Sequence, residues 1–236
     1  MFGSFAPRGS RLRPARINMK LTDFKLAAFD MDSTLINIEC IDEIAAAAGK
    51  KAEVAAITEA AMRGEITDFK GSLRRRLALL KGVPESALEE VYAKRLQMNP
   101  GVEKTAAALK AAGIKLLLVS GGFTFFSDRV AKRLGFDFAR ANVLEIENGL
   151  LTGRVVQQPW GDIVDGNEKK KMLLEIAAQL GLIASQTIAV GDGANDLPMM
   201  SVAGLSVAYH AKPKVREQAM IQINEGGMDK LLAHFG

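Results

Sequence analysis

Two aspartates, Asp30 and Asp32, stand two residues apart directly after the apolar run 26–29. An unperturbed aspartate has a pKa near ~3.9, so one of the two is ionised at neutral pH and can act as a nucleophile. The charge of this neighbour raises the pKa of the other aspartate, which can then act as an acid. A turn or a helix cap would use one carboxylate, but it has no need of two followed by Thr34. The segment therefore predicts a nucleophile and an acid in one site.

A second acidic cluster follows the apolar run 187–190 and contains Asp192, Asn195 and Asp196. Its Gly-Asp-Gly start, taken alone, is typical of an ordinary turn. The pairing of two such clusters, each after a predicted strand, is more informative, because carboxylate oxygens are ligands that Mg²⁺ prefers. Together the clusters predict a Mg²⁺ site for phosphoryl transfer through an aspartyl phosphate.

Two further segments fit a phosphate site, although neither identifies one by itself. The apolar run 114–119 ends in Ser120, Gly121 and Gly122, and a helical pattern follows. Glycines let backbone amides approach an anion, and the first turn of a helix offers unpaired N–H groups. Lys169 opens another helical pattern, and such a cation can balance charge between a metal and a nucleophile. The alternative is an ordinary strand-to-helix turn and a solvated helix face.

The elements that must position these residues alternate along the chain. The predicted strands are 25–30, 114–119, 186–190, 205–208 and 220–223. The predicted helices are 101–112, 123–134, 168–180, 195–203 and 213–219. This alternation predicts an α/β fold with a doubly wound parallel sheet, which binds ligands at the carboxyl ends of its strands.

Residues 49–96 interrupt the alternation with three amphipathic helical patterns and no strand pattern. These patterns lie near 50–63, 68–80 and 84–95. They predict a small inserted helical cap domain, whereas 21–48 and 97–236 form the catalytic core. A smaller insertion, roughly 143–156, has the pattern of a hairpin that turns at Asn148-Gly149.

Composition limits the class of protein. The chain has 236 residues, 48% of them hydrophobic, which suffices for one α/β core with a small second domain. Cys40 is the single cysteine, so an internal disulfide is excluded and a reducing, cytoplasmic compartment is expected. No apolar run approaches the roughly 20 residues that a membrane span needs.

The net charge of +4 is concentrated in the tail formed by residues 1–20. This tail holds five basic residues and no acidic one, and beyond it 26 basic residues balance 27 acidic ones. Nothing in the body of the chain therefore indicates a nucleic-acid partner. We expect the tail to be disordered. It is an arm for an anionic surface, an organelle transit peptide or, as we favour, an extension before a true start at Met19.

In this order, the four segments resemble the four motifs of the haloacid dehalogenase-like hydrolases, which use an aspartate nucleophile. The resemblance implies a Rossmann-like core with an inserted cap. It implies that Asp30 is the nucleophile, that Asp32 is the acid and base, and that Lys169 is the cation. A phosphate ester needs its leaving oxygen protonated, so an acid at Asp32 points to a phosphatase. Mg²⁺ would be bound by Asp30, the Asp32 carbonyl and Asp192, with Asp196 anchoring the waters of the metal.

Longer stretches resemble the phosphoserine phosphatase family within this superfamily. They are residues 31–45, 61–65, 72–76, 120–124 and 191–198. The resemblance implies that Glu39 binds the substrate ammonium group and Arg76 its carboxylate, with Arg74 and Arg75 as close rivals. Residues implied to close over the substrate are Met62 and Phe69. Residues implied to bind the phosphate are Ser120, Gly121, Gly122, Lys169 and Asn195.

The predicted function is Mg²⁺-dependent hydrolysis of O-phosphoserine, the last step of L-serine biosynthesis in the family that the chain resembles. This substrate presents a phosphate, a cation and a carboxylate, so a selective pocket needs one acid and one arginine besides the phosphate site. The alternatives are a phosphatase for another small ester, a phosphotransferase with an alcohol acceptor, or a non-catalytic binding module. We expect a small-molecule substrate, no nucleic-acid or membrane partner, and a monomer or homodimer.

Overall fold

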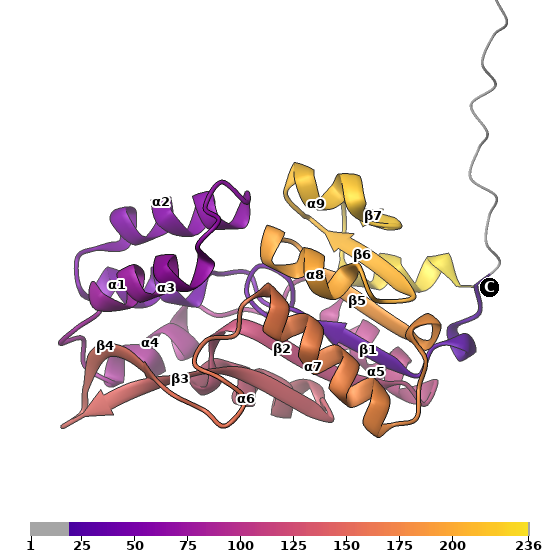
Figure 1. Cartoon of the computed structure of the whole chain (residues 1–236), viewed down its shortest axis with the longest axis horizontal. Coiled ribbons are helices and arrows are strands. Elements are labelled where there is room, and N and C mark those ends of the chain that lie inside the picture. The colour runs from indigo at the N-terminus through magenta and orange to yellow at the C-terminus, as the bar shows by residue number, and fades with distance from the viewer. Residues whose placement is uncertain (1–18, 236) are drawn as a thin grey trace, which may run out of the picture.

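The structure is a computed structural model and describes residues 19–235. The predicted basic tail therefore lies outside the described residues, except for Met19 and Lys20. The first described residues lie beside the C-terminal end (Figure 1), where the rings of Phe24 and Phe235 meet edge to face with centroids 5.7 Å apart.

One sheet of seven strands forms the centre of the fold, in the order β4-β3-β2-β1-β5-β6-β7. Every neighbouring pair is parallel except β3 with β4. The strands are β1 (Leu26–Phe29), β2 (Lys115–Phe123), β3 (Phe138–Glu147), β4 (Leu150–Val156), β5 (Thr187–Gly191), β6 (Leu205–Tyr209) and β7 (Ile221–Ile223). This confirms the predicted doubly wound parallel sheet.

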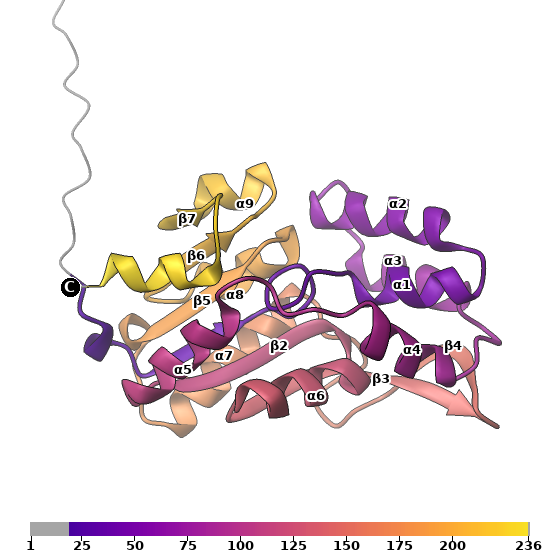
Figure 2. The same cartoon turned by 180° about the vertical axis from the view of Figure 1, so that it is seen from behind.

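Helices cover both faces of this sheet. In Figure 1, α7 lies in front of the sheet, whereas α5 and α6 are in front in the reverse view of Figure 2. The helices of the core are α5 (Val102–Ala111), α6 (Thr124–Leu134), α7 (Gly166–Gln179), α8 (Leu197–Met200) and α9 (Pro213–Gln218). Short 3-10 segments are η1 (Leu21–Asp23), η2 (Ala184–Gln186), η3 (Ala194–Asp196) and η4 (Met228–His234).

The side chains of β1 show why both faces need a covering. Leu26 and Ala28 belong to one hydrophobic cluster, which includes residues of α7, α8 and α9. Ala27 and Phe29 belong to the other cluster, with residues of α5 and α6. Successive side chains of a strand point to opposite faces, so a strand buried on both faces reads as an unbroken apolar run.

Four helices between β1 and β2 form the cap. They are α1 (Cys40–Ala47), α2 (Lys51–Met62), α3 (Phe69–Ala78) and α4 (Ser86–Lys94). The last three correspond to the predicted helices, but α1 was missed because it is short and no side-chain cap marks its start at Glu39. Helix α1 packs against α2 and α4. We therefore propose that the cap begins near residue 40, because the predicted boundary at 49 follows one of its helices.

The predicted hairpin is confirmed by the antiparallel pairing of β3 with β4. Asn148 and Gly149 both have positive φ, 51° and 75°, as the tight turn requires. Strand β3 starts earlier than predicted and also pairs in parallel with β2, so the hairpin extends the central sheet rather than standing apart from it.

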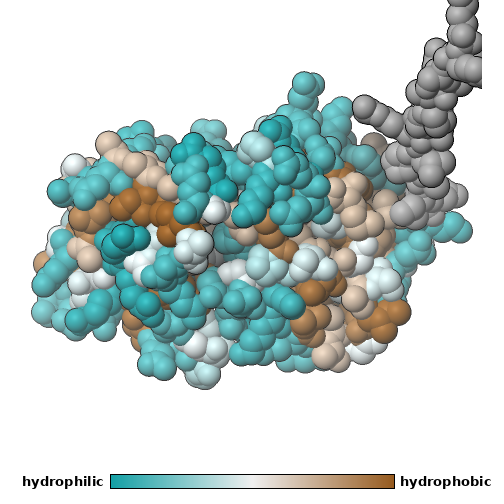
Figure 3. Space-filling view, turned by 45° about the horizontal axis from the view of Figure 1, so that its top comes forward, coloured by the Kyte–Doolittle hydropathy of each residue, from teal (hydrophilic) through white to brown (hydrophobic). Residues whose placement is uncertain are grey.

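Strand β1 lies between β2 and β5, and the chain builds the sheet outward from it in both directions. The carboxyl ends of β1 and β5 therefore meet where strand order reverses, and open α/β sheets bind ligands at such a point. The cap stands at this end of the sheet (Figure 1). Most of the surface in Figure 3 is hydrophilic, with separate hydrophobic patches. Within residues 19–235, no helix has the length and apolar character to cross a membrane.

Candidate active site

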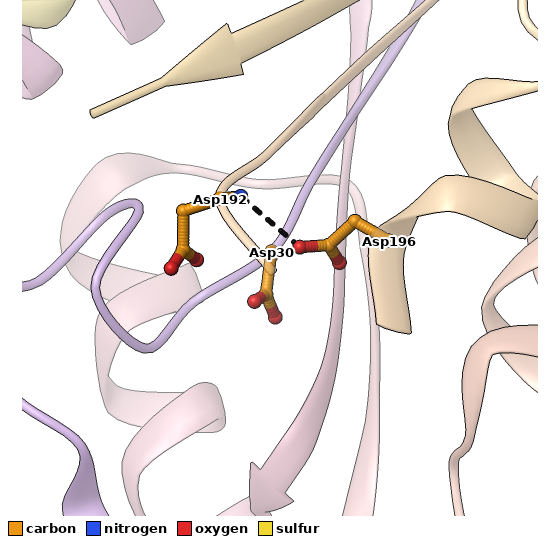
Figure 4. A group of neighbouring side chains, drawn as sticks. All are labelled: Asp30, Asp192 and Asp196. Atoms are coloured by element: carbon orange, nitrogen blue, oxygen red, sulfur yellow. Dashed lines mark hydrogen bonds between the residues drawn. The ribbon is translucent and has the colours of Figure 1, made fainter. Parts of the chain in front are cut away.

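Asp30 and Asp192 meet because they follow neighbouring strands in a shared register. Phe29 of β1 and Val190 of β5 are register partners. Asp30 directly follows Phe29, and Asp192 lies two residues after Val190. Asp196 joins them from the start of α8. The three buried side chains come from three segments and gather around one point (Figure 4). One carboxylate oxygen of each lies within 4.8 Å of the others.

Lys169 reaches this cluster from the first turn of α7. The helix begins here because the Asp165 carboxylate caps it, accepting the N–H of Glu168 at 2.9 Å. The fully buried Nζ of Lys169 donates to Asp196 Oδ1 at 2.7 Å and lies 2.6 Å from Asp30 Oδ1. Burial alone would lower the pKa of Lys169, but the charges of Asp196 and Asp30 outweigh burial and raise it. Lys169 therefore remains a cation.

The protein itself occupies both carboxylate oxygens of Asp196. Its Oδ1 accepts from Lys169, and its Oδ2 accepts the N–H groups of Asp192 and Gly193 at 3.1 and 3.0 Å (Figure 4 shows the first of these two). A Cβ at Gly191 would lie 2.4 Å from the Asp196 carboxyl group, so this close approach requires glycine. Asp196 thus holds the loop of Asp192, whereas its predicted role of anchoring the waters of the metal stays a prediction.

Burial raises the pKa of the acids at this point. The pKa of Asp30 is raised to about 7 by burial and by Asp196, against the opposing charge of Lys169. The pKa of Asp32 is raised to about 6 by burial, although hydrogen bonding from Cys40 opposes the shift. The pKa of Asp192 is raised well above its ordinary value by burial and by Asp196. Asp32 can therefore carry a proton near neutral pH, whereas Asp30 and Asp192 need a further positive charge to stay ionised.

The donor set fits a hard divalent cation. Three buried carboxylates converge, and Lys169 is their one ion-pair partner among the described residues. Thr34 Oγ1 donates to one oxygen of Asp192 at 3.1 Å and so orients that carboxylate. Because hard cations take oxygen ligands, and because three buried carboxylates share a single lysine, this cluster can bind a metal ion.

The structure corrects the predicted turn at Ser120, Gly121 and Gly122. Strand β2 continues through all three residues, and α6 begins only at Thr124. They are held there by β3, where the buried Asn142 donates from Nδ2 to the Gly121 carbonyl at 2.8 Å. The N–H of Gly122 donates to Ser120 Oγ at 2.9 Å, so this amide is already engaged. The hydroxyl proton of Ser120 remains available to a ligand because the oxygen acts here as an acceptor.

A cavity of about 30 Å³ lies between the strand ends and the cap. Predicted site residues in its lining are Asp30, Asp32, Glu39, Met62, Phe69, Arg76, Ser120, Gly121, Gly122 and Asn195. Lining residues that were not predicted are Ile41, Leu73 and Phe123. A cavity needs at least about 10–15 Å³ to hold one water molecule, so this one is small. The cap therefore lies close over the strand ends in this structure.

The cap closes directly on two glycines of the core. A Cβ at Gly193 would lie 2.3 Å from Cε of Met62, which ends α2. A Cβ at Gly121 would lie 3.3 Å from Cζ of Phe69, which begins α3. The missing side chains of these two glycines therefore make room for the cap.

The cap supplies one acid and one arginine to the cavity. Glu39 accepts a hydrogen bond from Ser33 Oγ at 2.6 Å, and burial, Asp32 and Asp192 raise its pKa well above the ordinary value. Arg76 is 4% exposed, and its Nε has no hydrogen-bond partner among residues 19–235. A buried donor without a partner is costly unless a ligand satisfies it.

The structure separates the three arginines that the sequence could not. Arg74 and Arg75 are exposed, and Arg74 pairs with Asp162 on the surface. Only Arg76 of this run lines the cavity.

Sequence reasoning missed the amides that hold these loops. Asn99 Nδ2 donates to the carbonyls of Ser33, Thr34 and Ile36 at 3.2, 2.9 and 2.9 Å. Asn142 Oδ1 accepts the N–H of Val164 at 2.9 Å. In the sequence, Asn99 and Asn142 are recognisable only as polar residues in or beside an apolar run. Such a position does not reveal which distant group the side chain contacts.

Comparisons with known proteins agree with this geometry. The sequence pattern of the haloacid dehalogenase-like hydrolases matches residues 24–204. The chain is 70% identical over 215 residues to a phosphoserine phosphatase of Polaromonas sp., covering 91% of each protein. It is 68% identical over 217 residues to a phosphoserine phosphatase of Albidiferax ferrireducens, covering 92% of each.

Two solved structures are also similar. One is a phospho-aspartyl intermediate analogue of phosphoserine phosphatase, and the other is a substrate-bound phosphoserine phosphatase complex. Each has a TM-score of 0.85 at 41% identity, covering 90% of this chain and 99% of the other.

Proposed function

From the premise that the chain belongs to the haloacid dehalogenase-like hydrolases, we propose that it hydrolyses O-phosphoserine to serine and phosphate through an aspartyl phosphate on Asp30. One observation supports this choice of substrate: Glu39 and Arg76 line the same cavity as Asp30 and Asp32. An acid and an arginine beside a phosphate site match the ammonium and carboxylate of an amino acid.

The two aspartates divide the chemistry. Asp30 attacks phosphorus and forms a bond to it while the bond from phosphorus to the serine oxygen breaks. Asp32, whose pKa is raised to about 6, donates its proton to that departing oxygen. In the second step Asp32 accepts a proton from water as the water oxygen bonds to phosphorus, and the bond from phosphorus to Asp30 breaks.

The residues around the phosphate balance its charge. Lys169 lies 2.6 Å from Asp30 and places a positive charge beside the nucleophile. Ser120 can donate its hydroxyl proton, and Gly121 and Gly122 line the same cavity beside it. Asn195 Oδ1 is buried without a hydrogen-bond partner among the described residues, so its side chain is also free for a ligand.

Asp30, the Asp32 carbonyl and Asp192 are the residues that would hold Mg²⁺, with Asp196 fixing the loop behind them. When bound, Mg²⁺ favours the ionised forms of Asp30 and Asp192 and withdraws charge from the phosphate oxygens. Lys169 is already committed to Asp30 and Asp196, so the chain leaves Asp192 for the cation.

The test is phosphate release from O-phospho-L-serine with and without Mg²⁺, beside O-phosphothreonine and sugar phosphates, with Asp30→Asn as the blank. Mg²⁺-dependent release confined to phosphoserine would support both the chemistry and the pocket. Equal release from all esters would keep the aspartyl-phosphate mechanism and reject the substrate. No release from any ester would favour a phosphotransferase or a binding module.

A further inference from the structure

A chain of hydrogen bonds behind Arg76 joins three helices of the cap. Arg76 on α3 donates from one terminal nitrogen to Thr58 Oγ1 on α2, at 3.0 Å. Thr58 Oγ1 lies 2.6 Å from Asp42 Oδ1 on α1 and 3.1 Å from the Val54 carbonyl. Thr58 is 2% exposed, so water does not compete for these bonds.

The direction of this chain is fixed by chemistry. A guanidinium group has donors and no acceptor, so the Thr58 oxygen must accept from Arg76. The single hydroxyl proton is then directed to one acceptor, and the shorter, charge-assisted bond is to Asp42. Donation to a carboxylate polarises the hydroxyl and makes its oxygen a better acceptor for Arg76.

The hydroxyl of Thr58 lies between Asp42 and Arg76 and contacts both. Among residues 19–235, Arg76 has one side-chain hydrogen-bond partner, Thr58, and the charges of Glu39 and Asp42 act on it without a direct ion pair. A direct pair with Asp42 would occupy the donors of Arg76 and offset its charge. Thr58 instead fixes the position of the guanidinium and leaves its Nε for a ligand.

We propose that Thr58, backed by Asp42, is a positioning residue that makes the enzyme select phosphate esters bearing a carboxylate, by holding Arg76 toward the cavity. This inference rests on the proposed function and adds to it the residue on which the selectivity of Arg76 depends. A role confined to tying α1, α2 and α3 together is the competing explanation, and it predicts equal losses for every substrate.

The test compares O-phospho-L-serine with O-phosphoethanolamine, which keeps the phosphate and ammonium groups but lacks the carboxylate. Thr58→Val retains the shape of the side chain and removes the hydroxyl. We expect the ratio of the two kcat/KM values to fall about tenfold, as for a lost hydrogen bond to a charged group. The change should lie in KM for phosphoserine rather than in kcat. Thr58→Ser keeps the hydroxyl and should retain the wild-type ratio.

Each other outcome is decisive. An equal loss for both substrates, or an unchanged ratio in a folded Thr58→Val, overturns the inference while the proposed function stands. A wild type that does not prefer phosphoserine overturns both. If Thr58→Val does not fold, Asp42→Asn replaces it, because this change weakens the same bond without altering size. Its ratio should fall by about threefold, in keeping with the smaller loss of one ionic partner, and an unchanged ratio overturns the inference.

Discussion

The two walls of the cavity are held in different ways. On the core side, Asp30 and Asp192 follow strands in a shared register, and Lys169 binds into the same buried cluster. On the cap side, Glu39 and Arg76 stand at or on short helices, and each is oriented by one hydroxyl. The chemistry of the site is therefore fixed by the sheet, whereas its selectivity depends on a few replaceable contacts in the cap.

Buried apolar side chains join the two walls, but the ion pairs between them are exposed. Lys212 of the core pairs with Glu59 of α2 at 2.7 Å, and the two side chains are 30% and 45% exposed. Lys70 and Arg74 of α3 pair with Asp162 of the core in the same exposed manner. Such pairs contribute about 0–1 kcal/mol each, so these ion pairs add little to the packing that holds the cap against the core.

The largest effect is expected on the core side. Asp30→Asn keeps the shape of the side chain and removes the nucleophile, so turnover should fall by at least about a thousandfold. Phosphate release measures this, and circular dichroism checks the fold. Turnover above a few per cent of wild type would assign the nucleophile to another residue.

A smaller loss, confined to substrate affinity, is expected on the cap side. Arg76→Lys retains the charge, but a lysine cannot form the bidentate pair of hydrogen bonds that an arginine forms with a carboxylate. KM for phosphoserine should therefore rise about tenfold or more, with kcat little changed. Arg75→Lys, one residue away and exposed, is the matched control and should leave KM unchanged. The prediction fails if the control raises KM and Arg76→Lys does not.

The electrostatics of the core wall can be tested through stability. Burial raises the pKa of Asp30 from 3.8 to about 7 and that of Asp192 well above 3.8. In metal-free protein these groups therefore contribute stability at low pH that is lost as pH rises through their folded pKa values. A bound cation favours the ionised forms and offsets that loss.

Added Mg²⁺ should therefore raise Tm by more at about pH 7.5 than at about pH 5.5, with a difference of about 3 °C, or about 1 kcal/mol for a chain of this size. Differential scanning fluorimetry measures both shifts. Asp192→Asn should greatly reduce the shift and its dependence on pH. Equal shifts at both pH values in the wild type would show that the buried carboxylates do not bind the ion.

The smallest effect is expected where the walls touch. Glu59→Gln removes an exposed ion pair with Lys212, so KM should rise by about two- to threefold, and its dependence on salt should weaken. Glu53→Gln, on the same helix but facing Lys50, is the control. Identical salt dependence in the wild type and Glu59→Gln would show that this pair does not hold the cap.

The same contrast explains what the sequence could predict. The positions of Asp30 and Asp192 followed from parallel strands, whose ends must meet at one edge of the sheet. The choice of Arg76 followed from a resemblance alone, because no physical pattern distinguished it from Arg74 and Arg75. The fold decides that choice, because α2 packs against both α1 and α3 and Thr58 of α2 contacts Arg76.

The residues that sequence reasoning missed share one property. Asn99, Asn142 and Thr58 act through hydrogen bonds to partners 16 to 66 residues away. Each looks like an ordinary polar residue until the fold places its partner beside it. The extension of β2 through Ser120 was missed for the same reason, since β3 and Asn142 hold that segment.

Lys212 contacts both the cap and the loop of Asp192. Its side chain pairs with Glu59 of the cap, and its backbone N–H donates to the carbonyl of Asp192 at 2.9 Å. Cation binding at Asp192 and closure of the cap are therefore thermodynamically coupled through Lys212. By thermodynamic reciprocity, any factor by which a cation favours the closed cap is the same factor by which the closed cap tightens its hold on the cation.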